Sequence, residues 1–462
     1  MSKQKDIRSS IQTYIDQHRI SMAEFSKRAG MNRGNLSTVM NHSTHKLLSL
    51  KQFDQVSTVL GFTHGELYPL YIDECFYGTV HWGKIREFLF RCAEWGLKDH
   101  TQTVIQRLSE DLKHIPEIFN TAEGLFEQGY NESAQILYET VVDSEKQHLS
   151  ERLAMSYYRL FKIDQNNIHK NLKAATQFLP YRGRLPEYLA LDGFISLAHL
   201  FIIREEWKEV EVYVEELYDL SQALFKNKTW KSSHFHSIRP FVYYYGQSYL
   251  LKSSICVQKQ DYEQALAWTE KYADLSGMIG VDARDQQEVL KLSQFATANR
   301  LLFRIKLGDQ TVISSYVSFM RCHPKEIIKG LTTLLEFANI HHYDMDQVLE
   351  EFNIFTDQVP SNLDANYNEA FQYFNKVLFY KQYAIYALKK RNYEKGVQFL
   401  LEGIKISKEI ENQEMLNKLT TLFEVYRAYA TLEQNNIYTM ICRKECEDEK
   451  QNYYLEFPAF SS

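Results

Sequence analysis

Residues 21–41 read SMAEFSKRAGMNRGNLSTVMN and predict two short helices that meet at a glycine. Ser21 precedes Glu24 with the spacing of a capping box, in which the Ser21 hydroxyl accepts a hydrogen bond from the Glu24 N–H and Glu24 bonds back. Gly30 ends the first helix, because glycine takes the left-handed conformation without strain. The side-chain oxygen of Asn32 is suited to cap the second helix. The stretch therefore predicts a helix, a tight turn and another helix.

The flanking residues carry helical patterns of their own. Upstream, isoleucines at every fourth position from Ile7 to Ile15 form one apolar stripe. Within the central stretch, Met31 and Leu36 have the character of a hydrophobic staple around the second helix start. Downstream, residues 49–61 predict a fourth helix that a glycine stops, and 63–71 begin a fifth. A head of five short helices is expected.

The second and third predicted helices resemble those of XRE/Cro-type repressor domains, which commonly read ELAKKAGVSRSTISRIENG. Residues 47–67 are similar to the later family pattern LxxLxxIAxALGVSLDELL. The resemblance covers about 65 residues and implies a helix-turn-helix domain whose third helix enters the major groove of DNA. We place this domain at residues 1–72.

Helical geometry indicates which side chains of the third helix would face DNA. With Leu36, Val39 and Met40 turned inward, the opposite face carries small and polar residues. Arg33 is suited to bidentate pairing with a guanine. The predicted DNA-contacting residues are Ser21, Lys27, Asn32, Arg33, Gly34, Asn35, Ser37, Thr38, Asn41 and Lys46. The family often has glutamine where Met22 stands, and Gly34 puts no side chain at the centre of the face, so specificity is expected to lean on Arg33 and DNA shape.

Composition favours a large helical protein. The 462 residues include only 18 glycines and 8 prolines, too few for the turns of an all-β chain, and 44% are hydrophobic. No apolar signal segment opens the chain, and no run of about 18 apolar residues would span a membrane. The six scattered cysteines form no Cys-x-x-Cys pair and are typical of reduced thiols. We expect a soluble cytoplasmic protein without a membrane partner.

Charge differs between the head and the rest of the chain. Residues 1–70 hold nine Lys and Arg against five Asp and Glu, a balance of +4. The whole chain holds 53 and 59, so the remainder holds 44 and 54, a balance of −10. A basic head on an acidic body predicts a polyanionic partner for the head alone.

Beyond residue 83 the pattern is helical, and a short polar phrase recurs. It reads QGYNESA at 128–134, EEWKEVE at 205–211, KQDYEQALA at 259–267, LGDQTVI at 307–313 and KRNYEKGV at 390–397. Four of the five contain an aromatic residue followed three positions later by a small or β-branched one: Tyr130 and Ser133, Trp207 and Val210, Tyr262 and Ala265, Tyr393 and Gly396. Each phrase follows one predicted helix and opens the next.

The phrases resemble the inter-helix turn of the tetratricopeptide repeat, commonly GDYDEAI, in which the aromatic residue wedges between paired helices. The resemblance implies a right-handed α-solenoid of about eight or nine helical pairs at ~40 residues each. We expect an all-α chain with a linker at 73–82, the solenoid at 83–452 and a tail at 453–462. The alternative is an irregular α-bundle without superhelical order.

A solenoid of this kind presents a concave groove, which suits an extended peptide. Alignment of the turn phrases predicts a set of groove-facing residues: Asp192, His199, Gln247, Ser254, Asn299, Lys381 and Gln382. Amide side chains there would bond a peptide backbone through both donor and acceptor. Ordinary solvent exposure is the competing interpretation for each residue. The run Tyr243-Tyr244-Tyr245 is expected to pack in the core.

Clusters that would carry catalysis are sparse. HHYDMD at 341–346 and HFH at 234–236 have no third, correctly spaced ligand, so we interpret both as solvated turns. No nucleotide-binding loop, Gly-x-Ser-x-Gly or His-Glu-x-x-His motif occurs. We expect neither enzyme activity nor a cofactor, and a metal enzyme that uses the histidines is the least favoured alternative.

An XRE-type head followed by a tetratricopeptide-like body resembles the family named for Rgg, Rap, NprR, PlcR and PrgX, the peptide-pheromone sensors of Gram-positive bacteria. The resemblance implies a homodimer that binds double-stranded DNA at an inverted-repeat operator. It also implies a short signalling peptide in the groove, and hence a quorum-sensing transcription regulator. The alternative is a scaffold that binds or sequesters a response regulator, with a vestigial head.

Overall fold

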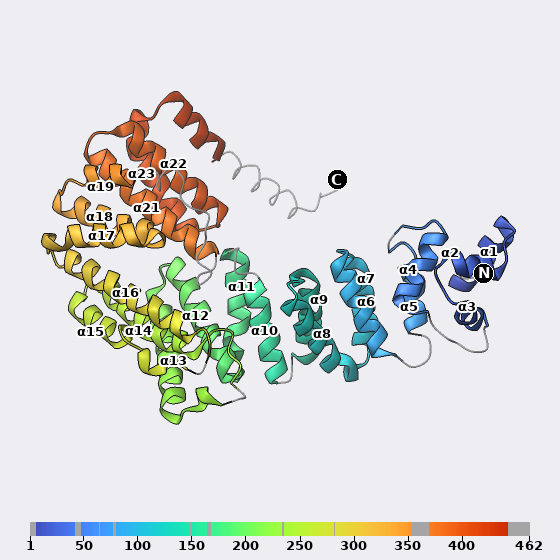
Figure 1. Ribbon diagram of the computed structural model, residues 1–462. Helices are drawn as coiled ribbons and strands as arrows, with labels where there is room; N and C mark the ends of the chain where they lie inside the picture. Colours follow the sequence, from blue (N-terminus) through green and yellow to red (C-terminus); the bar gives the residue numbers. More distant parts are fainter. Residues whose placement is uncertain are drawn as a thin grey trace, which may run out of the picture. The chain divides into compact units, whose positions relative to one another are not determined.

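The computed structural model describes residues 6–441 apart from 42–47, 64, 77–79, 147–149, 164–167, 233–234, 281 and 353–368. These residues form helices and connecting turns and contain no strand, so the predicted all-α class is confirmed (Figure 1). The chain divides into two compact units, Met1–Ile163 and Asp164–Ser462, each with its own internal contacts.

The first unit begins with short helices where the sequence predicts them. Its helices are α1 (Ile7–His18), α2 (Met22–Arg28), α3 (Arg33–Met40), α4 (Leu50–Val59), α5 (Tyr68–Cys75), α6 (Trp82–Glu94), α7 (Lys98–Ser109), η1 (Leu112–His114), α8 (Ile115–Glu127), α9 (Asn131–Glu145) and α10 (Glu151–Ile163). The isoleucine stripe of α1 is buried together with Phe25 and Leu36, which makes the core of the first three helices. α5 ends at Cys75, so the first three residues of the predicted linker at 73–82 are helical.

Polar and aromatic contacts join α4 and α5 to α6. Asp54 on α4 accepts a hydrogen bond from the Tyr68 hydroxyl (2.9 Å) and pairs with Arg91 on α6 (2.7 Å). The Tyr68 ring also stacks on Trp95 at 5.8 Å between centroids. The end of the head and the helix that follows it therefore share one packed contact.

A buried ion pair joins α8, α9 and α10. The Glu123 carboxylate of α8 accepts two hydrogen bonds from the Arg159 guanidinium of α10 (2.8 and 2.7 Å) and one from the Tyr138 hydroxyl of α9 (2.5 Å). Arg159 also lies over the Phe126 ring, 4.7 Å from its centroid. Because a buried charge is tolerated only when it is paired, this network fixes how the three helices pack.

The second unit continues as packed helical pairs. Its helices are α11 (Ile168–Phe178), η2 (Leu179–Arg184), α12 (Glu187–Ile203), α13 (Trp207–Asn227), η3 (Thr229–Lys231), α14 (Phe241–Gln258), α15 (Tyr262–Tyr272), η4 (Ser276–Met278), α16 (Asp285–Lys306), η5 (Gln310–Val312), α17 (Ile313–Cys322), η6 (Pro324–Glu326), α18 (Ile327–His341), α19 (Asp346–Glu351), α21 (Glu369–Lys389), α22 (Tyr393–Glu409), α23 (Gln413–Tyr426) and η7 (Arg427–Tyr429). Residues 432–441 are helical as well. The pairs that share the most extensive contact in this unit are α12 with α13, α14 with α15 and α21 with α22.

The turns between helices repeat one backbone geometry. A left-handed residue stands two positions before the next helix; at Glu205 its N–H donates to the Ile202 carbonyl, and the N–H that follows donates to the Phe201 carbonyl. The residues in this position are Gly96, Gly129, Glu205, Gln260, Gly308, Arg391 and Glu411, with φ between 56° and 93°. This is the Schellman arrangement, which satisfies carbonyls that a helix end leaves open.

The recurring sequence phrases coincide with these turns. α13, α15 and α22 begin at the aromatic residue of their phrase, and α9 begins one residue after it. The small or β-branched residue that follows is buried in all four phrases, and at Gly396 an added Cβ would lie 2.6 Å from Leu388. The predicted alternation of helices and turns is confirmed at the phrases. The turn at Glu411 is a further example that the sequence did not indicate.

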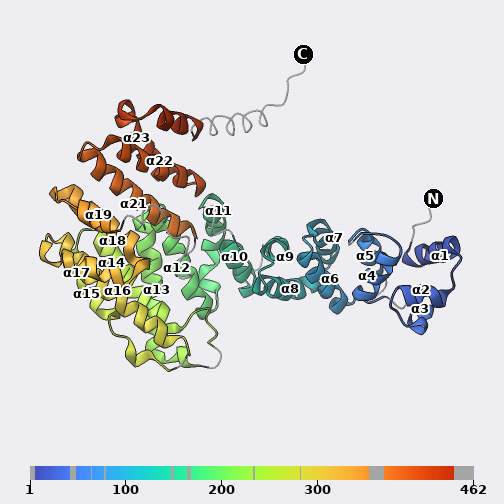
Figure 2. The same cartoon turned by 45° about the horizontal axis from the view of Figure 1, so that its top comes forward.

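Five helices of the second unit form what we call the helix circuit, namely α12, α14, α16, α18 and α21. Each contacts the next in this order, and α21 also contacts α12, so the circuit returns to its start (Figure 2). Residues 189–201 of α12 and 241–249 of α14 are all buried. At Gly246 of α14 a side chain would collide with Leu292 of α16, so the two helices require glycine to approach this closely.

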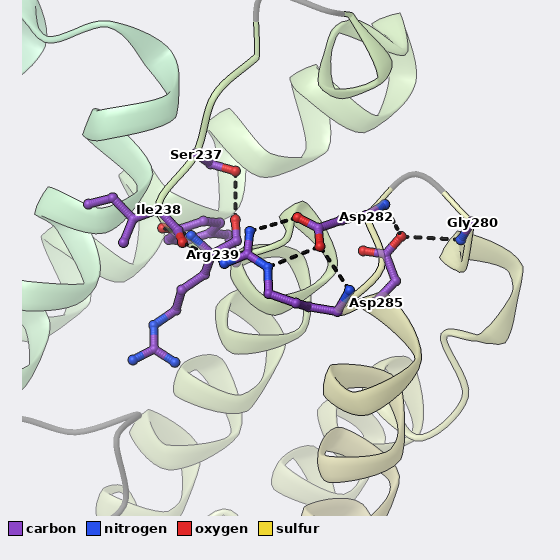
Figure 3. Close-up of polar contacts among 8 residues, drawn as sticks. Ser237, Ile238, Arg239, Gly280, Asp282 and Asp285 are labelled. Carbon is purple, nitrogen blue, oxygen red and sulfur yellow. Dashed lines mark hydrogen bonds and ion pairs between the residues drawn. The ribbon is translucent and has the colours of Figure 1, made fainter.

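Side chains also pin together the loops that lead into α14 and α16 (Figure 3). Arg284 donates to the Ile238 carbonyl (3.0 Å) and forks onto the Asp282 carboxylate (3.0 and 2.7 Å). Asp285 accepts the backbone N–H groups of Gly280 (3.2 Å) and Asp282 (2.8 Å). These bonds hold the entry points of two circuit helices.

Candidate functional site

The starts of α2 and α3 are capped by the residues that the sequence predicts. Ser21 Oγ accepts the Glu24 N–H (3.2 Å), and Asn32 Oδ1 accepts the N–H two residues later (2.8 Å). Gly30 lies between the helices with a φ of 60°. One detail is corrected: in this described stretch Glu24 does not complete a capping box, because its carboxylate pairs with Arg28 one turn later (3.2 Å).

α3 buries one face and exposes the other. Leu36 and Val39 are buried. Met40, predicted to turn inward with them, is only partly buried, because it is the last residue of the helix. Of the predicted DNA-contacting residues, the exposed ones are Ser21, Lys27, Asn32, Arg33, Gly34, Asn35, Ser37 and Asn41, Thr38 is half-buried, and Lys46 lies outside the described residues.

Arg8 of α1 ties α3 to α5. Its Nε donates to the Val39 carbonyl (2.8 Å), and its Nη1 pairs with Glu74 Oε1 (2.8 Å). Burial raises the pKa of Glu74 more than the neighbouring Arg8 lowers it, and both charged side chains are only 12% exposed. A buried polar contact on the inward side of α3 therefore sets the orientation of its exposed face.

The structure buries most of the residues predicted to face a groove. Asp192, His199, Gln247 and Asn299 are between 2% and 8% exposed. Ser254, Lys381 and Gln382 are half-buried. The interpretation as ordinary solvent-exposed residues is therefore wrong for the first four, because the helices that carry them, α12, α14 and α16, are packed against other helices at these positions. Their contact with a peptide stays a prediction.

Hydrogen bonds within the fold engage Asn299, Gln382 and Ser254, and two more of the seven residues, Asp192 and His199, also have internal partners. Asn299 Nδ2 donates to the Tyr272 hydroxyl (2.7 Å), so its amide serves the packing of α16 on α15. Gln382 of α21 accepts from Asn339 Nδ2 of α18 through its side-chain and backbone oxygens (3.1 and 3.0 Å). Ser254 Oγ donates to a backbone carbonyl one turn back in its own helix (3.1 Å). These three polar groups already serve the fold.

The structure adds a residue that sequence reasoning missed on α12. Ser196 lies between Asp192 and His199 on one helical face, and its hydroxyl is 3.4 Å from Asp192 Oδ2. The His199 ring lies 4.8 Å from the Phe371 ring of α21. The signal was available, since polar residues recurring at helical spacing in an otherwise apolar helix indicate a polar stripe.

Two amide oxygens in the helix circuit are buried without a hydrogen-bond partner among the described residues: Gln247 Oε1 of α14 and Asn339 Oδ1 of α18. An unsatisfied buried acceptor costs about 1–3 kcal/mol, so each is a candidate for contact with a ligand. Just before α14, the Arg239 guanidinium lies over the Tyr243 ring (4.7 Å), and the Arg239 backbone N–H donates to the Tyr244 hydroxyl (3.3 Å). The three consecutive tyrosines are buried, as predicted.

The acidic residues of the HHYDMD segment bind side chains at the end of α21. Lys390 pairs with Asp344 (3.0 Å) and Asp346 (2.5 Å), and Asp346 accepts the Tyr386 hydroxyl (2.8 Å). His234 of the HFH segment lies outside the described residues. In the part of the chain that the structure describes, no group of three or more His, Cys, Asp or Glu could hold a metal ion.

A scan against models of known protein families finds no match, and no curated protein matches the sequence. None of the described helices is long and apolar enough to cross a membrane. The fold defines the chain as an all-α protein of two helical units, and its function has to be inferred from the geometry.

Proposed function

We propose that this chain is a DNA-binding transcription regulator. The observation that carries the proposal is the α2–Gly30–α3 arrangement, two capped helices joined by a left-handed glycine, with the outer face of the second helix exposed. Arg33 is exposed in the first turn of α3, where a guanidinium can pair with guanine, and Lys27 adds attraction for phosphate. A homodimer at an inverted-repeat operator belongs to the same proposal, because one short helix contacts few base pairs.

The helical body is proposed to be a right-handed, tetratricopeptide-like solenoid that holds a short signalling peptide. The repeated turn geometry supports the solenoid. Support for the peptide comes from polar side chains inside the helix circuit, above all the polar stripe of α12 and the amides of Gln247 and Asn339. Amides of this kind bond both the N–H and the C=O groups of an extended backbone.

The salt dependence of DNA binding tests the first part. The full chain is titrated against a labelled mixed-sequence duplex of about 30 base pairs, and the logarithm of affinity should fall linearly with the logarithm of salt, by about 0.9 for each phosphate neutralised. Arg33→Ala should weaken binding, and Lys27→Ala, which removes the attraction for phosphate, should lower that slope by about one. Lys208→Ala removes the same charge from exposed residue 208 of α13 and is expected to leave binding unchanged.

Two results would overturn the DNA part. Absence of binding at low salt would leave a vestigial head and favour the scaffold for a response regulator. Equal losses in Arg33→Ala and Lys208→Ala would show that α3 is not the contacting helix. Selection from random duplexes is the second measurement, and it should enrich an inverted repeat.

Selection from a displayed heptapeptide library on the immobilised full chain tests the peptide part. Enriched sequences, resynthesised, should bind in calorimetry, and Gln247→Leu should weaken that binding while Lys208→Ala does not. A library that yields no binder would count against a peptide as the ligand.

A further inference from the structure

The last open carbonyl of α12 is satisfied by a residue from the far end of the second unit. A helix end leaves several carbonyls without helical partners, and the Schellman turn after α12 closes the two that precede Ile203. The Ile203 carbonyl accepts instead from Asn412 Nδ2 (3.1 Å), a contact across 209 positions of sequence. The end of α12 is therefore joined to the start of α23.

Asn412 caps two helices at once. Its Oδ1 accepts the Met415 N–H (3.1 Å), which makes it the N-cap of α23, while its Nδ2 serves the end of α12. The residue is 6% exposed. Because one atom accepts and the other donates, the contact requires an amide; aspartate keeps the acceptor and lacks the donor.

An ion pair lies beside this hydrogen bond. Lys418 of α23 pairs with Glu205, the left-handed residue that follows α12, and with Glu414 of its own helix (3.0 Å). The side chains of Lys418 and Glu205 are 41% and 28% exposed. The pair is partly screened by solvent and adds less than the buried hydrogen bond.

We propose that these four residues, Ile203, Glu205, Asn412 and Lys418, form a clasp that ties α12 of the helix circuit to α23 and controls access to the interior of the circuit. The clasp and the contact of α21 with α12 both join segments that are distant in sequence. Opening at these two places would separate α12 from α21 and α23 and would leave consecutive pairs such as α12 with α13 and α14 with α15 intact.

The clasp is small enough to work as a switch. Only one buried hydrogen bond and one partly exposed ion pair hold it closed. A ligand that prefers the open or the closed circuit can therefore shift the equilibrium between the two states. In the closed state the polar stripe of α12 is buried, with His199 against Phe371 of α21. Opening would expose that stripe. This inference concerns the second unit alone and stands whether or not the head binds DNA.

Isosteric substitution separates the clasp from ordinary helix capping. Asn412→Asp keeps the cap of α23 and removes the donor to Ile203. Asn392→Asp is the matched control, because Asn392 caps α22 in the same way (3.3 Å to the Lys395 N–H) and is exposed. Each is combined with Ser196→Cys, a thiol probe on the buried stripe, and labelling of that cysteine is followed by mass spectrometry of its peptide.

We expect Asn412→Asp to speed labelling at position 196 about tenfold and Asn392→Asp to leave it unchanged, since a buried carbonyl that loses its donor shifts the closing equilibrium by roughly that factor. Equal rates in both variants would overturn the proposal. If Asn412→Asp fails to fold, charge reversal decides instead. Lys418→Glu should speed labelling and the double change with Glu205→Lys should slow it again, and a double variant as fast as the single would also overturn it.

Discussion

At the scale of single residues, Arg8 is the side chain whose loss should cost the head most. Arg8→Met keeps an apolar stem but leaves the Glu74 carboxylate buried without its cation and the Val39 carbonyl without its donor. We expect the free energy of unfolding to fall by about 3 kcal/mol in chemical denaturation. Arg28→Met removes an exposed guanidinium from its pair with Glu24 and should cost under about 0.5 kcal/mol. Similar losses in the two variants would contradict this ranking.

Two buried thiols set an alkaline limit on the first unit. Burial raises the pKa of Cys75 to about 11 and that of Cys92 to about 12. Both pKa values lie above the value of about 8.5 for a thiol in the unfolded chain. The contribution of the two thiols to the free energy of unfolding is therefore complete below about pH 8.5 and is lost as the pH rises through their pKa values in the folded protein. We expect the melting temperature to fall above about pH 9 and Cys92→Ala to flatten that fall. The exposed Cys322 supplies the control, since Cys322→Ala should leave the pH dependence unchanged.

Residues whose partners lie nearby in sequence were the predictable ones. Ser21 and Asn32 could be assigned as caps because a cap bonds an N–H two or three residues away. Arg8 and Glu74 are 66 positions apart, and nothing in either segment marks the other as its partner. Glu24 shows the limit even at short range, because Arg28 competes for the carboxylate that the capping box would use.

At the scale of elements, the left-handed turn positions differ in sequence while sharing one geometry. A residue other than glycine costs roughly 1–2 kcal/mol in this conformation, partly offset because glycine loses more entropy on folding. Arg391→Gly, in the exposed turn between α21 and α22, should therefore raise the free energy of unfolding by up to about 1 kcal/mol in chemical denaturation. Gly129→Ala places a side chain in the same conformation and should lower it by about as much. Destabilisation by Arg391→Gly would show that its side chain, rather than the backbone, holds the turn.

The same turns explain what the sequence could predict of the elements. Phrases with an aromatic residue and a small residue marked four helix starts, since both residues are required by the packing of the pair. The turn at Glu411 lacks that signature and was missed. The faces of α12 and α14 could not be assigned either, because a helix buried on all sides has no amphipathic stripe, and groove-facing positions projected from the turns fell inside the unit.

At the scale of the whole molecule, the all-α class follows from the scarcity of glycine and proline, and the alternation of helices and turns in the body follows from the recurring phrases. The position of the main division does not. The resemblance to XRE/Cro-type domains predicted a boundary at residue 72, whereas the compact units divide after Ile163. Contacts such as Asp54 with Arg91 place the first body helix in the same unit as the head, and such contacts leave no trace in local composition.

Two units with separate internal contacts should respond separately to substitution. Helical repeats are stabilised mainly by contacts between neighbours, so a local loss spreads little along the chain. We expect Arg8→Met to raise amide hydrogen exchange within residues 6–163 and to leave 168–441 unchanged, and Asn412→Asp to do the reverse, in mass spectrometry of the full chain under native conditions. Arg28→Met should change neither unit. A rise in both units from either substitution would mean that the chain opens as one cooperative body, and the clasp would then be coupled to the head through global stability rather than through a local change of shape.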